Sequence, residues 1–379
     1  MNRGTPVPIT PDVLTWAISE SGFSVEEIAE RLDVPPPTLR AWQSGEEVPR
    51  LTQFRRLASV LRRPAATFLL PEAPLSSIPT VEFRHPVAAG SESRQHLSPE
   101  ERRWLREAHR LQKAGSWLGK QLGRPAASIR RASLREDPET VAAAVRGDLQ
   151  VAFDEQLGWK SVSEAQRSWR SRLEDAGILV FFIPLGQASC RGFSVWDERA
   201  PLIAVNTAWN PEARIFTLFH ELGHLLTRTD SACIDTWRQV VPEKGGDPAE
   251  RWCEQFAAAV LLPWSDLEDF LERQIGWKRG NTIRDLATVG RIARKLKTSL
   301  RATTLRLIAH QVVPWELYRA IPAAVDSKKG GGGRGRDRSE IRRGQYGERT
   351  IHLFKEAIER EILSRDDVLS YLDVPDADL

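Results

Sequence analysis

The sequence predicts an α+β protein that is mostly helical and contains one small sheet. Three observations support this. Capping residues followed by amphipathic runs mark helices along most of the chain. The β-branched and aromatic residues typical of strands gather in one region, at ILVFFI and the two segments after it. Finally, 379 residues with 41% hydrophobic content are enough for two or three domains.

The composition restricts the classes of function. A formal net charge of +3 is small for this length, which argues against a nucleic-acid coat or a polybasic membrane binder. Three scattered cysteines, Cys190, Cys233 and Cys253, predict free thiols and a reducing compartment. Residues 1–10 lack the apolar run of a secretory signal, and no later run has the length of a membrane span. We therefore expect a cytoplasmic protein without a membrane partner.

The first helical segment, residues 1–75, contains four short expected helices, at 13–21, 24–32, 37–43 and 51–61. Ser24 and Glu27 fit a capping box, and Gly22 fits the end of the preceding helix. The run SVEEIAERLDVPPPTLRAWQSGEEVP resembles the helix-turn-helix of the XRE, or lambda repressor-like, family. This resemblance implies an N-terminal helix-turn-helix domain.

In such a domain, the helix beginning near Pro36 would present Thr38, Arg40 and Gln43 to the DNA major groove. The charge of the segment does not favour this, because residues 1–75 hold eight Lys and Arg against nine Asp and Glu. Two interpretations therefore stay open. The segment binds DNA, or it is a helical module that docks a protein or its own chain.

Two further helices are expected before the strands. Ser98 and Glu101 form a capping box at the start of a long amphipathic helix. Ser161 and Glu164 begin another helix, which Gly177 ends. These elements open the second predicted domain, residues 76–275.

Strands are expected at 178–183, 192–196 and 202–205, which implies a small sheet. The segment 192–196 is a candidate edge strand to which an extended substrate peptide could add by backbone hydrogen bonding. Asn210 and Pro211 then supply an N-cap and a first-turn proline for a helix through PEARIFTLFHELGHLL.

This helix carries the motif H-E-x-x-H at residues 220–224. Its four-residue spacing places His220 and His224 on one helix face, where two neutral imidazoles can share one Zn²⁺ ion. Glu221 can act as the general base that takes a proton from water and delivers it to a leaving amine. A chance match on an exposed helix is the alternative. The apolar flanks IFTLF and LL favour the metal, because ionisable groups set against a core need a partner.

A catalytic zinc needs a third protein ligand and one open position. Glu250 and Glu254 lie one turn apart in ERWCEQFAAAVLLP, and one could bind the metal while the other orients a histidine. Alternatively, both are surface acids at a helix start. Cys253 is better explained as a small buried residue than as a fourth ligand.

The run NTAWNPEARIFTLFHELGHLL, followed by ERWCEQFAAAVLLP, resembles the ImmA/IrrE metallopeptidases, in particular longer members with an XRE domain in front. The resemblance implies a zincin-like domain in which His220, His224 and Glu250 bind Zn²⁺ and Glu221 is the base. This chain departs from the family at Glu254, where asparagine is usual.

The C-terminal part is predicted to be helical. Residues 276–326 again suggest helix, turn and helix; their basic residues could contact phosphates, but a solvated face explains them better. Residues 327–379 comprise a Gly-rich linker, SKKGGGGRGRDR at 327–338, and two short helices.

The expected function is that of a zinc endopeptidase whose protein substrate, by family resemblance, is an XRE-type transcriptional repressor controlling stress-response or mobile-element genes. The alternative is a DNA-binding regulator or antitoxin-like component with a non-proteolytic zinc fold. The intact Glu221 argues against that alternative, because a purely structural zinc site has no use for a base.

Overall fold

The structure, a computed structural model, describes residues 5–61, 63–74, 98–229, 231–233, 247–322 and 337–374. Its contacts divide the chain into two compact units, 1–80 with 89–107, and 81–88 with 108–379. Helices predominate and one four-stranded sheet is present in the described ranges, as expected for the α+β class. None of the helices in these ranges is both long and apolar enough to cross a bilayer.

The N-terminal unit has four α-helices at the predicted places, followed by a short 3-10 helix: α1 (Pro11–Ser21), α2 (Val25–Leu32), α3 (Pro36–Ser44), α4 (Leu51–Leu61) and η1 (Ala65–Leu69). The capping box of α2 is present, since Ser24 N donates to Glu27 at 2.8 Å and Glu27 N donates to Ser24 Oγ at 3.1 Å. Gly22 ends α1 with a φ of 76°. Leu39 and Trp42 of α3 are fully buried among these helices.

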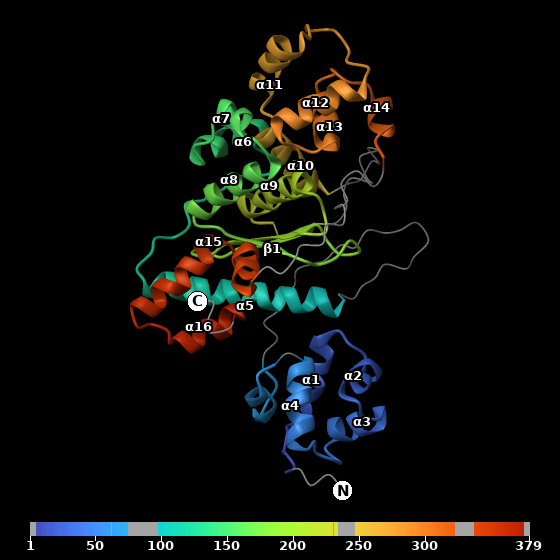
Figure 1. Ribbon diagram of the computed structural model, residues 1–379, viewed down its shortest axis with the longest axis vertical. Helices are drawn as coiled ribbons and strands as arrows, with labels where there is room; N and C mark the ends of the chain where they lie inside the picture. Colours follow the sequence, from blue (N-terminus) through green and yellow to red (C-terminus); the bar gives the residue numbers. More distant parts are fainter. Residues whose placement is uncertain are drawn as a thin grey trace. The chain divides into compact units, whose positions relative to one another are not determined.

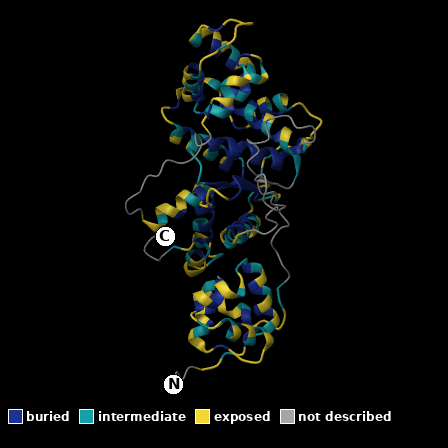
Figure 2. Cartoon of the chain, turned by 90° about the vertical axis from the view of Figure 1, so that its right-hand side faces the viewer, coloured by how far each residue is buried: buried dark blue, intermediate teal, exposed yellow. Residues whose placement is uncertain are grey.

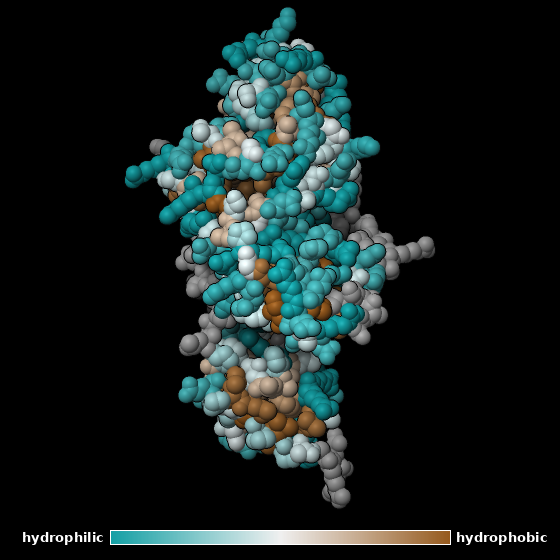
Figure 3. All heavy atoms as spheres, turned by 90° about the vertical axis from the view of Figure 1, so that its left-hand side faces the viewer, coloured by the Kyte–Doolittle hydropathy of each residue, from teal (hydrophilic) through white to brown (hydrophobic). Residues whose placement is uncertain are grey.

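Apolar side chains also lie on the surface of this unit. Among the described residues of this unit, the exposed large apolar side chains are those of Val48, Leu51, Leu69 and Leu70. Figure 3 shows apolar surface gathered on the N-terminal part of the chain.

The long helix α5 (Pro99–Gln121) begins with the predicted capping box, in which Ser98 N donates to Glu101 at 2.8 Å.

The sheet of the second unit consists of β1 (Leu179–Ile183), β2 (Gly192–Val195), β3 (Leu202–Asn206) and β4 (Ser231–Cys233), in the order β1-β3-β2-β4. β1 runs parallel to β3, and β2 runs antiparallel to both of its neighbours. The expectation that residues 192–196 form a free edge is wrong, because β4 pairs with β2 through Gly192 and Cys233. A three-residue strand is too short to show in the sequence pattern.

Helices cover one face of the sheet and extend away from it (Figure 1): α6 (Pro138–Asp148), α7 (Phe153–Gly158), α8 (Val162–Asp175), α9 (Pro211–Thr227), α10 (Pro248–Leu261), α11 (Trp264–Phe270), α12 (Leu286–Leu296), α13 (Leu300–Ala309) and α14 (Trp315–Arg319). Figure 2 shows the buried residues concentrated in the strands and the helices next to them.

The helices of residues 286–309 share this core. Val289, Ile292 and Leu307 belong to the same buried cluster as Val180 of β1 and Phe219 of α9. The predicted boundary between the segments 76–275 and 276–326 stays a prediction.

A buried polar network ties α10 to its neighbours. Arg146 donates to Gln156 Oε1 at 2.8 Å and to the carbonyl of Val260 at 2.7 Å, while Arg306 donates to the carbonyl of Leu262 at 2.8 Å. These carbonyls lie at or just beyond the end of α10 and would otherwise be buried without partners. The network fixes the helix that carries Glu250.

The opposite face of the sheet is covered by α15 (Arg338–Glu359), which is followed by α16 (Arg365–Leu372). Tyr346 is buried with its ring 5.3 Å from that of Phe181. Helices are present at the C-terminal end as expected, and the 22 residues of α15 consist of two helical segments that meet at a non-helical Gly347. The predicted linker, 327–338, falls almost entirely outside the described residues.

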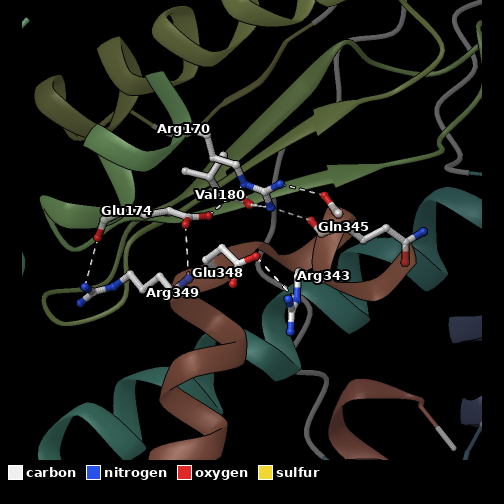
Figure 4. Close-up of polar contacts among 8 residues, drawn as sticks. Arg170, Glu174, Val180, Arg343, Gln345, Glu348 and Arg349 are labelled. Atoms are coloured by element: carbon white, nitrogen blue, oxygen red, sulfur yellow. Dashed lines mark hydrogen bonds and ion pairs between the residues drawn. The ribbon is translucent and has the colours of Figure 1, made fainter. Parts of the chain in front are cut away.

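A buried ion pair holds this bend against α8 and β1 (Figure 4). Arg170 Nε donates to Glu174 at 2.9 Å, and its guanidinium also donates to the carbonyls of Val180 and Gln345. Gly347 has a φ of 86°, and a Cβ built there would lie 1.9 Å from Glu174 Oε1. Only glycine therefore fits at this bend.

Candidate metal centre

Helix α9 places the predicted motif in the interior of the second unit. The Asn210 side chain accepts the backbone N–H of Ala213 at 2.8 Å and so caps the helix start. His220, Glu221 and His224 are 3%, 0% and 1% exposed. The alternative of a chance match on an exposed helix therefore does not apply, and the polar groups of the motif need partners inside the protein.

Glu250, in the first turn of α10, meets both histidines. His220 Nε2 lies 3.1 Å from His224 Nε2, and the two oxygens of Glu250 lie 3.2 Å from His220 Nε2 and 3.6 Å from His224 Nε2. Within the described residues, these three form the one group of three or more His, Cys, Asp or Glu side chains that could hold a metal ion. Two imidazoles and a carboxylate are the donor set of a catalytic zinc site, so these residues fit Zn²⁺.

The alternative ligand Glu254 does not join this group. It lies one turn further along α10, and its charge contributes to a raised pKa of His220. Its assignment as a ligand or as an orienting partner stays a prediction. Cys253 is buried, as expected, and is not part of the group.

The electrostatics of the two histidines differ. Burial by itself would lower the pKa of His220, but the hydrogen bond to Glu250 and the charge of Glu250 outweigh burial and raise this pKa. For His224, burial and the charge of His220 lower the pKa to about 3. His224 is therefore neutral near pH 7 and offers a ring lone pair, which metal binding requires.

Thr229 is a site residue that the sequence pattern did not reveal. Its hydroxyl lies 2.9 Å from His224 Nδ1, the ring nitrogen that faces away from Glu250. A hydrogen bond at the outer nitrogen fixes the orientation of a metal-binding imidazole. The five-residue spacing from His224 follows no helical rule, because the chain has already left α9 at Arg228, where φ is 57°.

Gly192 of β2 is a second such residue. A Cβ atom built on Gly192 would lie 2.7 Å from Cγ2 of Thr217, 2.8 Å from the carbonyl oxygen of Ala204 and 3.2 Å from Cγ of Glu221. Real Cβ atoms do not approach backbone or side-chain atoms this closely, so glycine lets β2 lie directly against the side of α9 that carries Glu221.

The residues predicted to contact DNA lie in the N-terminal unit. Thr38, Arg40 and Gln43 are all in α3, where the Arg40 guanidinium pairs with Glu26 of α2. Gln43 Nε2 lies 3.5 Å from the hydroxyl of Thr15 in α1. Their role in DNA binding stays a prediction.

Known proteins resemble the part of the chain that contains this centre. Residues 173–307 match the family model of the IrrE N-terminal-like domain, Peptidase_M78. The chain is 31% identical over 159 residues, 41% of its length, to the radiation response metalloprotease IrrE of Deinococcus deserti, of which it covers 52%. It is 33% identical over 98 residues, 26% of its length, to that of Deinococcus radiodurans, of which it covers 29%.

The matched range includes α9 and α10, and so the whole group of His220, His224 and Glu250. The chain covers about half of the first relative's length and less than a third of the second's. Residues 173–307 thus match an IrrE N-terminal-like metallopeptidase domain, which supports a place for this chain in the ImmA/IrrE family.

Proposed function

We propose that this chain is a zinc-dependent endopeptidase that cleaves a transcriptional repressor and so regulates gene expression. One observation carries the peptidase part: His220, His224 and Glu250 converge within 4.8 Å beside the buried Glu221. A structural zinc site would favour four protein ligands and would not place a carboxylate next to them without using it as a ligand.

His220, His224 and Glu250 would hold the zinc ion. Bound there, zinc supplies Lewis acidity towards the peptide carbonyl and makes water more acidic. The side chain of Glu221 accepts a proton from the attacking water while the oxygen of that water bonds to the carbonyl carbon. The same carboxyl then returns the proton to the amide nitrogen as the C–N bond breaks, which yields a carboxylic acid and an amine.

The protein surroundings support this role of Glu221. The residue is fully buried on α9, and the close approach of β2 at Gly192 limits the space around its side chain. A confined carboxylate keeps one orientation towards the reacting water, which lowers the entropy cost of the proton transfer.

The substrate class rests on resemblance. Two relatives are named radiation response metalloproteases. The resemblance of the sequence to ImmA/IrrE metallopeptidases with an XRE domain in front implies an XRE-type repressor as the target. We therefore propose a role in a stress response or in the control of mobile-element genes, with the N-terminal unit contacting DNA or the repressor.

The test compares new protein N-termini in cells that express wild type, Glu221→Gln, His224→Ala or Glu316→Gln. Glu316 is an exposed acid of α14, so its change is a matched control for the loss of one carboxylate. We expect a new N-terminus within a repressor in wild-type and Glu316→Gln cells only. The same cleavage with Glu221→Gln, or no cleavage in any of the four, contradicts the proposal.

A further inference from the structure

Two arginines and a tryptophan form a cationic corner at the C-terminal end of α9. The guanidinium carbon of Arg228 lies 3.1 Å from the centre of the Trp196 ring, and the charge of Arg131 acts on Arg228. Trp196 is 38% exposed, Arg131 is exposed and Arg228 is half-buried. The corner, defined as Arg131, Trp196 and Arg228, therefore faces solvent.

Backbone contacts fix the place of each member. The backbone N–H of Arg228 donates to the carbonyl of His224, and the guanidinium donates to the carbonyl of Leu225. The N–H of Ala132 donates to the carbonyl of Leu226 at 3.0 Å, which brings Arg131 to the same helix end. Trp196 directly follows β2.

The corner and the candidate metal centre are built on the same two neighbouring elements, β2 and α9. β2 follows α9 from Gly192, which lies against Glu221, to Trp196, which lies against Arg228. Arg228 is four residues beyond His224, or roughly 6 Å along the helix axis. An extended peptide spans that distance with about two residues. A substrate whose scissile bond lies at the metal centre can therefore reach the corner.

The two positive charges of the corner favour the binding of an anion. Across the described residues, no carboxylate forms an ion pair with Arg131 or Arg228. Burial, and then the charge of Arg131, lower the pKa of Arg228, although an arginine side chain keeps its proton near pH 7. Capping of the α9 carbonyls explains why Arg228 is present. It does not explain the second arginine beside it.

We propose that the cationic corner binds an acidic side chain of the protein substrate, about two or three residues from the scissile bond. A carboxylate bound at this end of α9 would offset the like charges of Arg131 and Arg228 and form charge-assisted hydrogen bonds. The stacking of Arg228 on Trp196 holds one of these groups in place before the substrate arrives. This inference rests on the proposed peptidase function, because it assumes a peptide at the metal centre.

The first experiment measures binding without cleavage. Full-length Glu221→Gln protein, loaded with zinc, is used to select binding peptides from a random library. The selection is repeated with two double variants, which carry Arg131→Ala or Arg130→Ala in addition to Glu221→Gln. Arg130 is the matched control, since it is the neighbouring arginine and pairs with Asp148 at 2.7 Å. We expect peptides with Asp or Glu to be enriched, and Arg131→Ala to reduce this enrichment about two- to fivefold, as for a solvent-exposed ion pair.

Arg130→Ala should leave the enrichment unchanged, and raising the salt concentration should weaken it. Equal enrichment in all three proteins, enrichment of neutral peptides only, or a failure to retain any peptide overturns the inference.

The second experiment digests the same library with wild-type protein and determines the cleaved bonds by mass spectrometry. Cleavage that needs Glu221 but shows no preference for acids refutes the corner and leaves the peptidase function intact. Acid-selective binding without any cleavage supports the cationic corner and refutes the peptidase function. The two failures are therefore distinguishable.

Discussion

Gly223 and Cys253 meet where α9 and α10 pack against each other. A Cβ atom built on Gly223 would lie 2.9 Å from Sγ of Cys253 and 3.1 Å from its Cβ. The glycine inside the HELGH motif is thus a spacing residue. It allows α10 to come close enough for Glu250 to reach His220 and His224.

Replacing Gly223 with alanine should weaken zinc binding. The added methyl group must push α10 away, at a cost of about 1–3 kcal/mol, or up to roughly a hundredfold in zinc affinity if the whole cost falls on the site. Competition with a chromophoric chelator measures this affinity. Gly119→Ala on α5 is the control, because a Cβ there meets nothing within 4 Å. Unchanged zinc affinity in Gly223→Ala would refute the spacing role.

Replacing Gly192 with alanine should affect cleavage more than zinc binding. Its Cβ would press on Thr217 and Glu221, and neither residue belongs to the candidate metal ligands His220, His224 and Glu250. We expect at least a tenfold loss in kcat, since a base that is displaced by a few tenths of an ångström loses its alignment. Zinc stoichiometry and cleavage rate are measured on the same preparation. Equal losses of bound zinc and of cleavage rate would mean that β2 supports the zinc ligands instead of Glu221.

Replacing Thr229 with valine removes the hydroxyl beside His224 Nδ1. The imidazole then loses the partner that fixes its orientation, and we expect zinc affinity to fall about tenfold. Thr304→Val is the matched control, because among the described residues that hydroxyl donates to the carbonyl of Leu300 within its own helix α13. A loss of equal size in both variants would indicate a general effect on folding.

His310 should make stability depend on pH. Its ring is stacked on Trp264 at 3.6 Å, and burial together with the charge of Arg306 lowers its pKa to about 4, against about 6.5 in an unfolded chain. Between these values the unfolded state binds more protons, so this contribution is complete above pH 6.5 and is lost as the pH falls towards 4. Urea unfolding of metal-free protein at pH 7 and pH 5 measures the change in the free energy of unfolding.

In His310→Phe, which keeps an aromatic ring against Trp264, the decrease between pH 7 and pH 5 should be smaller than in wild type. Both proteins carry the same histidines at the candidate metal centre, so their titration cancels in the comparison. An identical decrease would show that the lowered pKa of His310 does not contribute.

Features that depend on neighbouring residues were predictable from the sequence. The capping box of Ser24 and Glu27, the N-cap at Asn210 and the spacing of His220 and His224 all follow local rules, and the structure shows each of them. The sequence left the choice between Glu250 and Glu254 open, because the histidines that Glu250 meets lie on another helix. No rule of sequence spacing links residues on two different helices.

Features that depend on distant contacts were not predictable. The pairing of Gly192 with Cys233 joins residues far apart in the sequence, and the fit of Gly223 against Cys253 requires two helices to be packed first. Likewise, the bend at Gly347 has a reason only once Glu174 is beside it. A glycine in a single sequence does not tell which neighbour it accommodates.

The ion pair of Arg170 and Glu174 also has a consequence for the order of biosynthesis. Ribosomes make α15 more than a hundred residues after β1, so Phe181 of β1 lacks its ring contact with Tyr346 until then. Arg170 meanwhile lacks the carbonyl of Gln345 that it binds in the finished protein. A nascent chain that already contains His220, His224 and Glu250 thus has an unfinished sheet beneath them, and the candidate metal centre gains its full support only once α15 has been made.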